Sequence, residues 1–374
     1  MTPIENRFVV AISGGVDSSV AAWMLAREGL SVVGLFMRNG VHVDAAESSK
    51  KSCCSVGDAR DARMVAAHLG IPFQAVDLSD EFREIIRYFL SEYGRGRTPN
   101  PCAVCNRDLK FDRLLRFAED LGAEGVATGH YARLAVEGGR VRIRRGADPD
   151  KDQSYQLFGV AERNLLRTRL PIGDLKKSRV RELAREAGLK TAEKRDSQEI
   201  CFVPGNDYRK LLAEKGVELH PGDLVDTSGR KLGEHEGTEH FTIGQRRGHR
   251  IGGGDPLYVV ALEPGSGRVV LGSRDECGVR SLRVADLNWI GFDVPASGEF
   301  RCTVQHRYRG VPAEASVFVE GSAGEVVFDE PELAVTPGQG AAFYRGDLLL
   351  GGGWIESTPR SRAASGAPAT AKAT

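Results

Sequence analysis

The amino-acid sequence predicts an α/β protein, with a doubly wound parallel sheet in its first half and short β-strands in its second. Two patterns support this prediction. Up to about residue 205, strand-sized apolar runs alternate with helical segments, and strands that alternate with helices form parallel sheets. Beyond that point, turn signals such as PG and EPGSG separate short β-branched runs, which is typical of a small barrel or sandwich.

Apolar periodicity predicts the elements of the first half in order. Residues 8–12 form a continuous apolar run, which is typical of a strand buried on both faces. Further strands are predicted over residues 31–37, 72–76 and 125–128, and helices over residues 20–28, 56–69, 81–93 and 109–121. Ligands of such a sheet lie beyond the carboxyl ends of its strands.

The second half is predicted to contain two small domains. Short strands are expected over residues 301–305, 314–319, 324–328, 341–344 and 348–353. We therefore expect an α/β domain over residues 1–205, a central domain over 206–284 and a β-barrel over 285–357. Residues 358–374 are rich in Ala, Ser, Thr and Pro without apolar periodicity, and a disordered tail is predicted there.

Composition restricts the class of protein. No apolar run approaches the roughly 18 residues of a membrane span, and the first residues lack the pattern of a secretory signal. We therefore expect a cytoplasmic protein that makes no membrane contact. In that reducing compartment, the seven cysteines are not expected to form a disulfide framework.

Net charge gives two conflicting indications. The 51 basic and 51 acidic side chains cancel, which argues against a nucleic-acid partner. Residues 140–195, however, hold 16 Lys and Arg against 8 Asp and Glu, and such clustering favours contact with RNA phosphates. A basic helix over residues 176–185 and a basic loop over residues 242–250 are the two candidate segments.

A glycine- and serine-rich loop follows the first predicted strand. Residues 13–19 read SGGVDSS and lead into a helix, so Gly14 and Gly15 can expose consecutive N–H groups that bind an anion. Asp17 suits such a site when a cation is present, which indicates Mg²⁺ on a pyrophosphate. The sequence is not a Walker loop, because no Gly-Lys-Ser/Thr follows. The alternative is a tight turn with a serine cap.

The cysteines suggest three kinds of chemistry. Cys102 and Cys105 are spaced C-x-x-C in RTPNPCAVCN, and Cys201 lies in DSQEICF. A thiol near a cation or a helix start becomes a thiolate nucleophile. The alternatives are half of a structural zinc site and an iron–sulfur cluster held by Cys102, Cys105 and Cys201. The remaining cysteines are expected to be buried small hydrophobic residues; they are Cys53, Cys54, Cys277 and Cys302.

These motifs carry a resemblance to known enzymes. SGGVDSS resembles the pyrophosphate-binding loop of the ATP pyrophosphatases. Together with RTPNPCAVCN, ATGHYAR (127–133), KDQSYQLF (151–158) and DSQEICF (196–202), it resembles the bacterial tRNA-specific 2-thiouridylases over residues 8–356. The resemblance implies an ATP-pyrophosphatase domain, a small central domain and a C-terminal β-barrel. It also implies ATP-dependent 2-thiolation of the wobble uridine of tRNA: the uracil C2 oxygen is adenylated, a cysteine persulfide supplies sulfur, and AMP and pyrophosphate are released.

The resemblance also assigns roles to residues of this chain. Cys105 matches the catalytic nucleophile, and Cys201 matches the cysteine that carries the persulfide. Asn100, Pro101 and Cys102 match contacts to the target base. The positions that match the ATP site are Ala11, Ile12, Ser13, Gly14, Gly15, Val16, Asp17, Ser18, Met37 and Gly129. The positions that match tRNA contacts are His130, Lys151, Asp152, Gln153, Arg307, Tyr308 and Gln339.

The implied cofactors and partners are ATP, Mg²⁺, the anticodon loop of tRNA, and a sulfur-carrier protein or cysteine desulfurase relay; a [4Fe-4S] cluster is the open alternative. Many relatives have Asp where this chain has Cys102, so Cys102 competes with Cys105 for the role of nucleophile.

Two other functions remain as alternatives. One is another ATP-pyrophosphatase synthetase that acts on a small molecule, and the other is a zinc-dependent RNA-binding module without catalysis.

Overall fold

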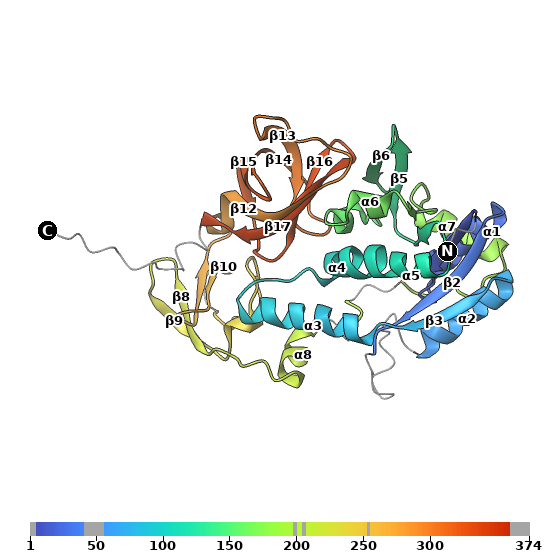
Figure 1. The fold of residues 1–374 in the computed structure, drawn as a ribbon. Coiled ribbons are helices and arrows are strands. Elements are labelled where there is room, and N and C mark those ends of the chain that lie inside the picture. Colours follow the sequence, from blue (N-terminus) through green and yellow to red (C-terminus); the bar gives the residue numbers. More distant parts are fainter. Residues whose placement is uncertain (1–4, 41–55, 197–199, 204–206, 253–254, 360–374) are drawn as a thin grey trace.

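The first half of the chain folds around a five-stranded parallel sheet (Figure 1). The computed structural model describes residues 5–40, 56–196, 200–203, 207–252 and 255–359. The sheet has the order β3–β2–β1–β4–β7. Its strands are β1 (Arg7–Ala11), β2 (Ser31–Arg38), β3 (Phe73–Asp77), β4 (Gly125–Ala127) and β7 (Thr168–Arg169). All of its pairings are parallel, so the predicted parallel sheet is confirmed.

Helices cover both faces of this sheet. Val9 of β1 faces a cluster that contains Phe111 and Leu115, whereas its neighbour Val10 faces a cluster with Ala22 and Leu25. This alternation follows from the two-residue period of a strand. The α-helices of the domain are α1 (Val16–Arg27), α2 (Val56–Leu69), α3 (Ser79–Gly94), α4 (Pro101–Val104), α5 (Leu114–Asp120), α6 (Glu162–Leu165) and α7 (Lys177–Glu186). The domain is therefore doubly wound, as predicted.

The helix predicted over residues 109–121 begins earlier than expected. It is the end of a continuous helical stretch in which the π-helix η1 (Cys105–Arg113) joins α4 to α5. Asn100 starts the stretch: its Oδ1 accepts a hydrogen bond of 3.2 Å from the N–H of Ala103, and Pro101 occupies the first turn, where its missing N–H costs nothing. Cys102 and Cys105 therefore lie on one helical stretch.

The central region is a four-stranded sheet in the order β10–β11–β8–β9. Its elements are α8 (Tyr208–Glu214), β8 (Gly222–Asp226), β9 (Lys231–His235), the 3₁₀-helix η4 (Thr238–His240), β10 (Tyr258–Glu263) and β11 (Arg268–Gly272). Leu224, Val259 and Leu271 are buried in its core. Tyr208 of α8 stacks on Tyr93 of α3 with ring centroids 4.5 Å apart, which attaches this region to the first domain.

The C-terminal region is a closed six-stranded barrel. Its elements are the 3₁₀-helix η5 (Asp275–Cys277), β12 (Gly278–Trp289), β13 (Glu299–Gln305), β14 (Ala313–Glu320), β15 (Ala323–Leu333), β16 (Gly340–Arg345) and β17 (Leu348–Ser357). The additional pairing of β12 with β17 closes it. The predicted fold class is thereby confirmed, whereas the predicted domain limits stay a prediction.

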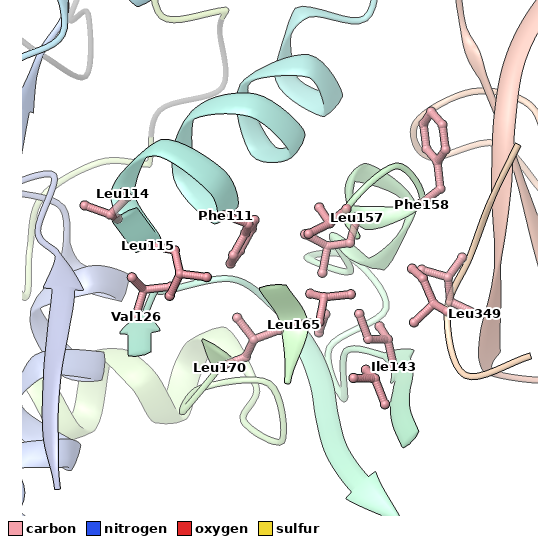
Figure 2. Close-up of a cluster of buried hydrophobic side chains, with 14 of the residues drawn as sticks. Phe111, Leu114, Leu115, Val126, Ile143, Leu157, Phe158, Leu165, Leu170 and Leu349 are labelled. Carbon is pink, nitrogen blue, oxygen red and sulfur yellow. The ribbon is translucent and has the colours of Figure 1, made fainter. Parts of the chain in front are cut away.

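The barrel is joined to the first domain by main-chain hydrogen bonds and by a shared core. The hairpin of β5 (Ala132–Glu137) and β6 (Arg140–Arg145) adds to the barrel sheet, with Ile143 paired to Leu349 of β17. Figure 2 shows this shared core. Leu115 and Val126 lie at one end of it, and Phe158, which follows the 3₁₀-helix η2 (Ser154–Leu157), lies near Leu349 at the other.

Among the helices that the structure describes, none combines the length and the apolar character that crossing a membrane requires.

Candidate active site

The glycine-rich loop lies at the carboxyl end of β1, between that strand and α1. Gly14 has φ +72°, and a Cβ there would lie 2.4 Å from the carbonyl oxygen of Asp58. The N–H of Ser13 donates to Ser18 Oγ over 3.1 Å, and Ser18 and Ser19 donate to the carbonyl oxygen of Gly15 over 3.2 and 2.7 Å. The serines thus hold the loop in one conformation.

The loop exposes N–H groups at the start of a helix. Gly15 is the N-cap residue of α1, and no side chain caps the helix. Uncapped N–H groups and the positive end of the helix dipole together bind anions. Gly129 packs on the same turn, since a Cβ there would lie 2.7 Å from Ser18 N. The residues predicted to bind ATP phosphates therefore form a cradle that fits an anion.

Asp17 is the carboxylate of this cradle. It accepts a hydrogen bond of 2.6 Å from Tyr131 Oη, and both of its oxygens lie 2.8 Å from Lys177 Nζ. Burial, followed by the charge of Asp17, raises the pKa of Tyr131, so the phenol stays protonated. Lys177 also lies 2.8 Å from Asp196. Mg²⁺ is commonly held by one or two carboxylates together with substrate phosphates, and Asp17 fits that role.

One apolar cluster contacts Met37, Cys105 and Cys201. Each is partly buried and packs against the core formed by Phe82, Phe89, Leu109 and their neighbours. Met37 lies near the carboxyl end of β2, the edge at which ligands of parallel sheets bind. Cys105 is the first residue of η1, and Cys201 lies in the segment after α7. Cys102, by contrast, is exposed.

The described cysteines belong to no group of side chains suited to a single metal ion. Among the residues that the structure describes, no three His, Cys, Asp or Glu side chains are grouped closely enough to hold a metal ion. This finding concerns sites for a single metal ion, and the iron–sulfur cluster considered from the sequence stays a prediction. Cys277 and Cys302 are buried, as expected. Cys53 and Cys54 lie outside the described residues.

Two residues predicted to contact tRNA, Asp152 and Gln153, form hydrogen bonds that hold the site together. Asp152 accepts hydrogen bonds from Arg145 over 2.8 Å, Gly146 N over 2.9 Å and Ser154 N over 3.0 Å. Gln153 Oε1 accepts from the N–H of Tyr131 over 3.0 Å, and Tyr131 in turn bonds Asp17. The KDQSY segment thus supports the residue that positions Asp17.

Lys151 and His130 are also engaged within the protein. Lys151 Nζ lies 2.7 Å from Asp196. His130 is buried, and its Nδ1 lies 2.7 Å from Thr128 Oγ1. Burial, followed by the charge of Lys110, lowers the pKa of His130 well below its usual value, so the ring is neutral at pH 7.

The predicted barrel residues line a cavity of about 770 Å³. Arg307, Tyr308 and Gln339 lie there beside Thr98 of the segment that leads to Cys102. Gln339 Nε2 donates to the carbonyl oxygens of Thr98 and Pro99 over 3.1 and 2.8 Å. Gln339 therefore holds the segment that precedes Asn100.

The central region supplies cavity residues that sequence reasoning did not assign. Arg209 and Arg247 line the cavity with Thr242 and Gln245. The basic character of residues 242–250 indicated Arg247, whereas nothing in the sequence indicated Arg209. The basic stretch 140–195, in contrast, is largely paired internally. Examples are Arg140 with Glu162 and Arg179 with Glu186.

Comparison with known proteins agrees with this architecture. A family model described as the tRNA methyl transferase HUP domain matches residues 6–205. Models described as the tRNA methyl transferase PRC-barrel domain and the aminomethyltransferase beta-barrel domain match residues 209–273 and 279–355.

Relatives match nearly the whole chain. The tRNA-specific 2-thiouridylase of Solibacter usitatus is 44% identical over 94% of this chain and 100% of its own length. Those of Geobacter metallireducens and Carboxydothermus hydrogenoformans are 46% and 47% identical, over 94% of this chain and 97% and 98% of theirs. A solved 4-thiouridine synthetase in complex with RNA and bound ATP aligns at 18% identity and a TM-score of 0.34, over 56% of this chain and 50% of its own. On the strength of its close relatives, the chain belongs to the family of the tRNA-specific 2-thiouridylases.

Proposed function

We propose that this chain catalyses the ATP-dependent 2-thiolation of the wobble uridine of tRNA. One observation carries the proposal. Met37, Cys105 and Cys201, which are far apart in the sequence, pack against one apolar cluster. That arrangement suits an enzyme that adenylates a base and then delivers sulfur to it. Membership of the thiouridylase family favours this function over a small-molecule synthetase and over a zinc-dependent RNA-binding module.

The first step makes the uracil carbonyl reactive. The C2 oxygen attacks the α-phosphorus of ATP, the bond to the pyrophosphate breaks, and AMP becomes the leaving group at C2. The N–H groups of Gly15 and the turn that follows stabilise the departing pyrophosphate. Asp17 would hold the Mg²⁺ that accompanies ATP, and the ion, when bound, neutralises charge on the pyrophosphate.

The second step transfers sulfur, and two routes balance. In one, the Cys105 thiolate attacks the Cys201 persulfide, hydrosulfide leaves and displaces AMP at C2, and a Cys105–Cys201 disulfide remains for a cellular thiol to reduce. In the other, the terminal persulfide sulfur attacks C2 and displaces AMP, and Cys105 then resolves the adduct with formation of the same disulfide. A sulfur-carrier protein or cysteine desulfurase relay reloads Cys201.

The cavity beside Thr98 suits the RNA partner. Arg247 and Arg307 are exposed there. The hydrogen bonds found for them among the described residues go to their main-chain carbonyl oxygens, so the charges of their side chains are available to phosphates. Tyr308 offers an aromatic ring for base stacking. We propose that the anticodon loop of tRNA contacts this cavity and that the protein acts in the cytoplasm, where its substrate is found.

The test follows labelled ATP in the presence of unmodified tRNA. The proposal expects AMP and pyrophosphate to form only when tRNA is present, and Cys105→Ser and Cys201→Ser to lose thiolation while Cys102→Ser retains it. A zinc-dependent RNA-binding module would form no AMP. A small-molecule synthetase would form AMP without tRNA, and either of these two results would contradict the proposal.

A further inference from the structure

A lysine far along the chain reaches the back of the phosphate loop. Lys194 lies in the segment after α7, 180 residues from Gly14. Its Nζ donates to the carbonyl oxygen of Gly14 over 2.8 Å, to Asp58 Oδ1 over 2.7 Å and to Asp61 Oδ2 over 2.6 Å. An ammonium group has three donors, so all three are used. The side chain is only 14% exposed, and no motif in the sequence assigned it a role.

The hydrogen bond to Gly14 fixes the direction of one peptide group. The described residues contain no cis peptide bond, and in a trans peptide the C=O and the next N–H point in opposite directions. Holding the Gly14 carbonyl toward Lys194 therefore aims the N–H of Gly15 to the other side. That side is the start of α1, where the cradle exposes its uncapped N–H groups.

The peptide group after Gly14 could rotate easily, because glycine restricts its backbone little. The hydrogen bond from Lys194 to the Gly14 carbonyl oxygen therefore fixes an orientation that the chain alone would not fix. Gly14 has φ +72°, and glycine has a wide choice of backbone conformations. Inside the turn, Gly14 also packs closely on the main chain of Asp58, the same residue whose carboxylate bonds Lys194. Lys194 and Asp58 thus hold the glycine from its carbonyl side.

The charge of Lys194 persists throughout the physiological range. Burial by itself lowers the pKa of Lys194, but the hydrogen bonds that it donates to Asp58 and Asp61, together with their charges, outweigh burial, so its pKa is raised. Lys194, Asp58 and Asp61 together carry one net negative charge. The lysine therefore does not neutralise phosphate from this position, and its effect on a bound anion must pass through the loop.

We infer that Lys194 is a positioning residue for ATP, which holds the Gly14 peptide so that the Gly15 N–H points at the phosphates. The inference rests on the proposed binding of ATP by this loop. It predicts a selective defect: loss of Lys194 weakens binding of the β- and γ-phosphates and leaves binding of the nucleoside part intact.

The experiment measures ATP and AMP binding by calorimetry for the wild type and for Lys194→Met. We expect the ATP affinity to fall roughly tenfold or more, as for a lost charge-assisted hydrogen bond, and the AMP affinity to change by less than about twofold. Lys190→Met is the matched control, because Lys190 is exposed in the same segment and should leave both affinities unchanged. An unchanged ATP affinity in Lys194→Met, or equal losses for ATP and AMP, would overturn the inference.

A second variant separates positioning from charge balance. Lys194→Met removes the lysine that Asp58 and Asp61 share, which can disturb folding. The double variant Asp61→Ala/Lys194→Met restores the original net charge of the group but not the bond to Gly14. We expect its ATP affinity to stay low, and recovery to the wild-type value would show that Lys194 only balances charge.

The outcome is independent of the thiolation reaction. If the wild type binds ATP but makes no thiouridine, the proposed function is contradicted. The role of Lys194 is then decided by the ATP and AMP affinities alone. If the wild type binds no ATP, both are contradicted.

Discussion

Gly14 and Gly15 are adjacent glycines with different structural demands. Gly14 has φ +72° and no room for a Cβ, whereas Gly15 has φ −90° and its nearest neighbour, Ser13 Oγ, would lie 3.4 Å from an added Cβ. We predict that Gly14→Ala lowers the free energy of unfolding by about 1–3 kcal/mol, the cost of such strain, and that Gly15→Ala costs less. Urea unfolding of both variants measures the two changes in the free energy of unfolding. Equal decreases would contradict the difference between the two glycines.

Burial separates the described cysteines: Cys102 is exposed, whereas Cys277 and Cys302 are buried. Burial, followed by the charge of Glu314, raises the pKa of Cys302 to about 12, so hardly any thiolate forms at pH 8. We predict that iodoacetamide labels the exposed Cys102 and leaves Cys302 unmodified in the native protein. Mass spectrometry of tryptic peptides provides the measurement. Labelling of Cys302 at the rate of Cys102 would refute this prediction.

Local motifs were visible in the sequence at this scale, but their partners were not. The SGGVDSS loop and the C-x-x-C spacing could be recognised because their chemistry lies in consecutive residues. The contacts of Gln153 with Tyr131 and of Lys194 with Gly14 join residues 22 and 180 positions apart. Periodicity carries no information about such contacts.

An ion pair ties η4 of the central region to the segment before β8. His220 Nδ1 lies 2.6 Å from Glu239 Oε1, and this hydrogen bond raises the pKa of His220. A raised pKa in the folded state stabilises the protein below the unfolded value of about 6.5, and that stability is lost as pH rises through the folded value.

We therefore predict that the wild type loses thermal stability between pH 6 and pH 8 relative to His220→Gln, which cannot titrate. Melting temperatures of both proteins across this range give the answer. Parallel curves would show that the pair does not contribute.

Element boundaries were less predictable than element types. The helix over residues 109–121 was expected, but its extension back to Pro101 depends on the Asn100 cap and on a π-helical stretch. The β5–β6 hairpin was missed because it completes a barrel edge formed some 200 residues later. Pairing with a distant strand leaves no periodic signal in the hairpin itself.

The three regions meet around the cavity that contains Arg247 and Arg307. If these side chains contact phosphates, each Arg→Ala substitution should weaken tRNA binding and lower the slope of log K against log salt by roughly 0.7, the value for one contact to a single strand. Filter binding at several salt concentrations tests this. Arg246→Ala is the matched control, because Arg246 is exposed next to Arg247 but does not line the cavity. If Arg246→Ala lowered the slope as much as Arg247→Ala, a phosphate contact specific to the cavity would be contradicted.

Whole-chain charge was the least informative observation. A net charge of zero argued against RNA, and the basic stretch 140–195 that argued for it is largely neutralised by internal ion pairs. The exposed arginines of the cavity come from the central region and the barrel, which only folding brings together.

The most direct test of the account is nucleoside analysis of an unmodified tRNA transcript after incubation with the protein, ATP and a persulfide donor. We predict that mass spectrometry finds 2-thiouridine at the wobble position, in amounts matched by AMP, and none with Cys105→Ser or Cys201→Ser. Absence of 2-thiouridine with the wild type, or its undiminished formation by both variants, would contradict the account.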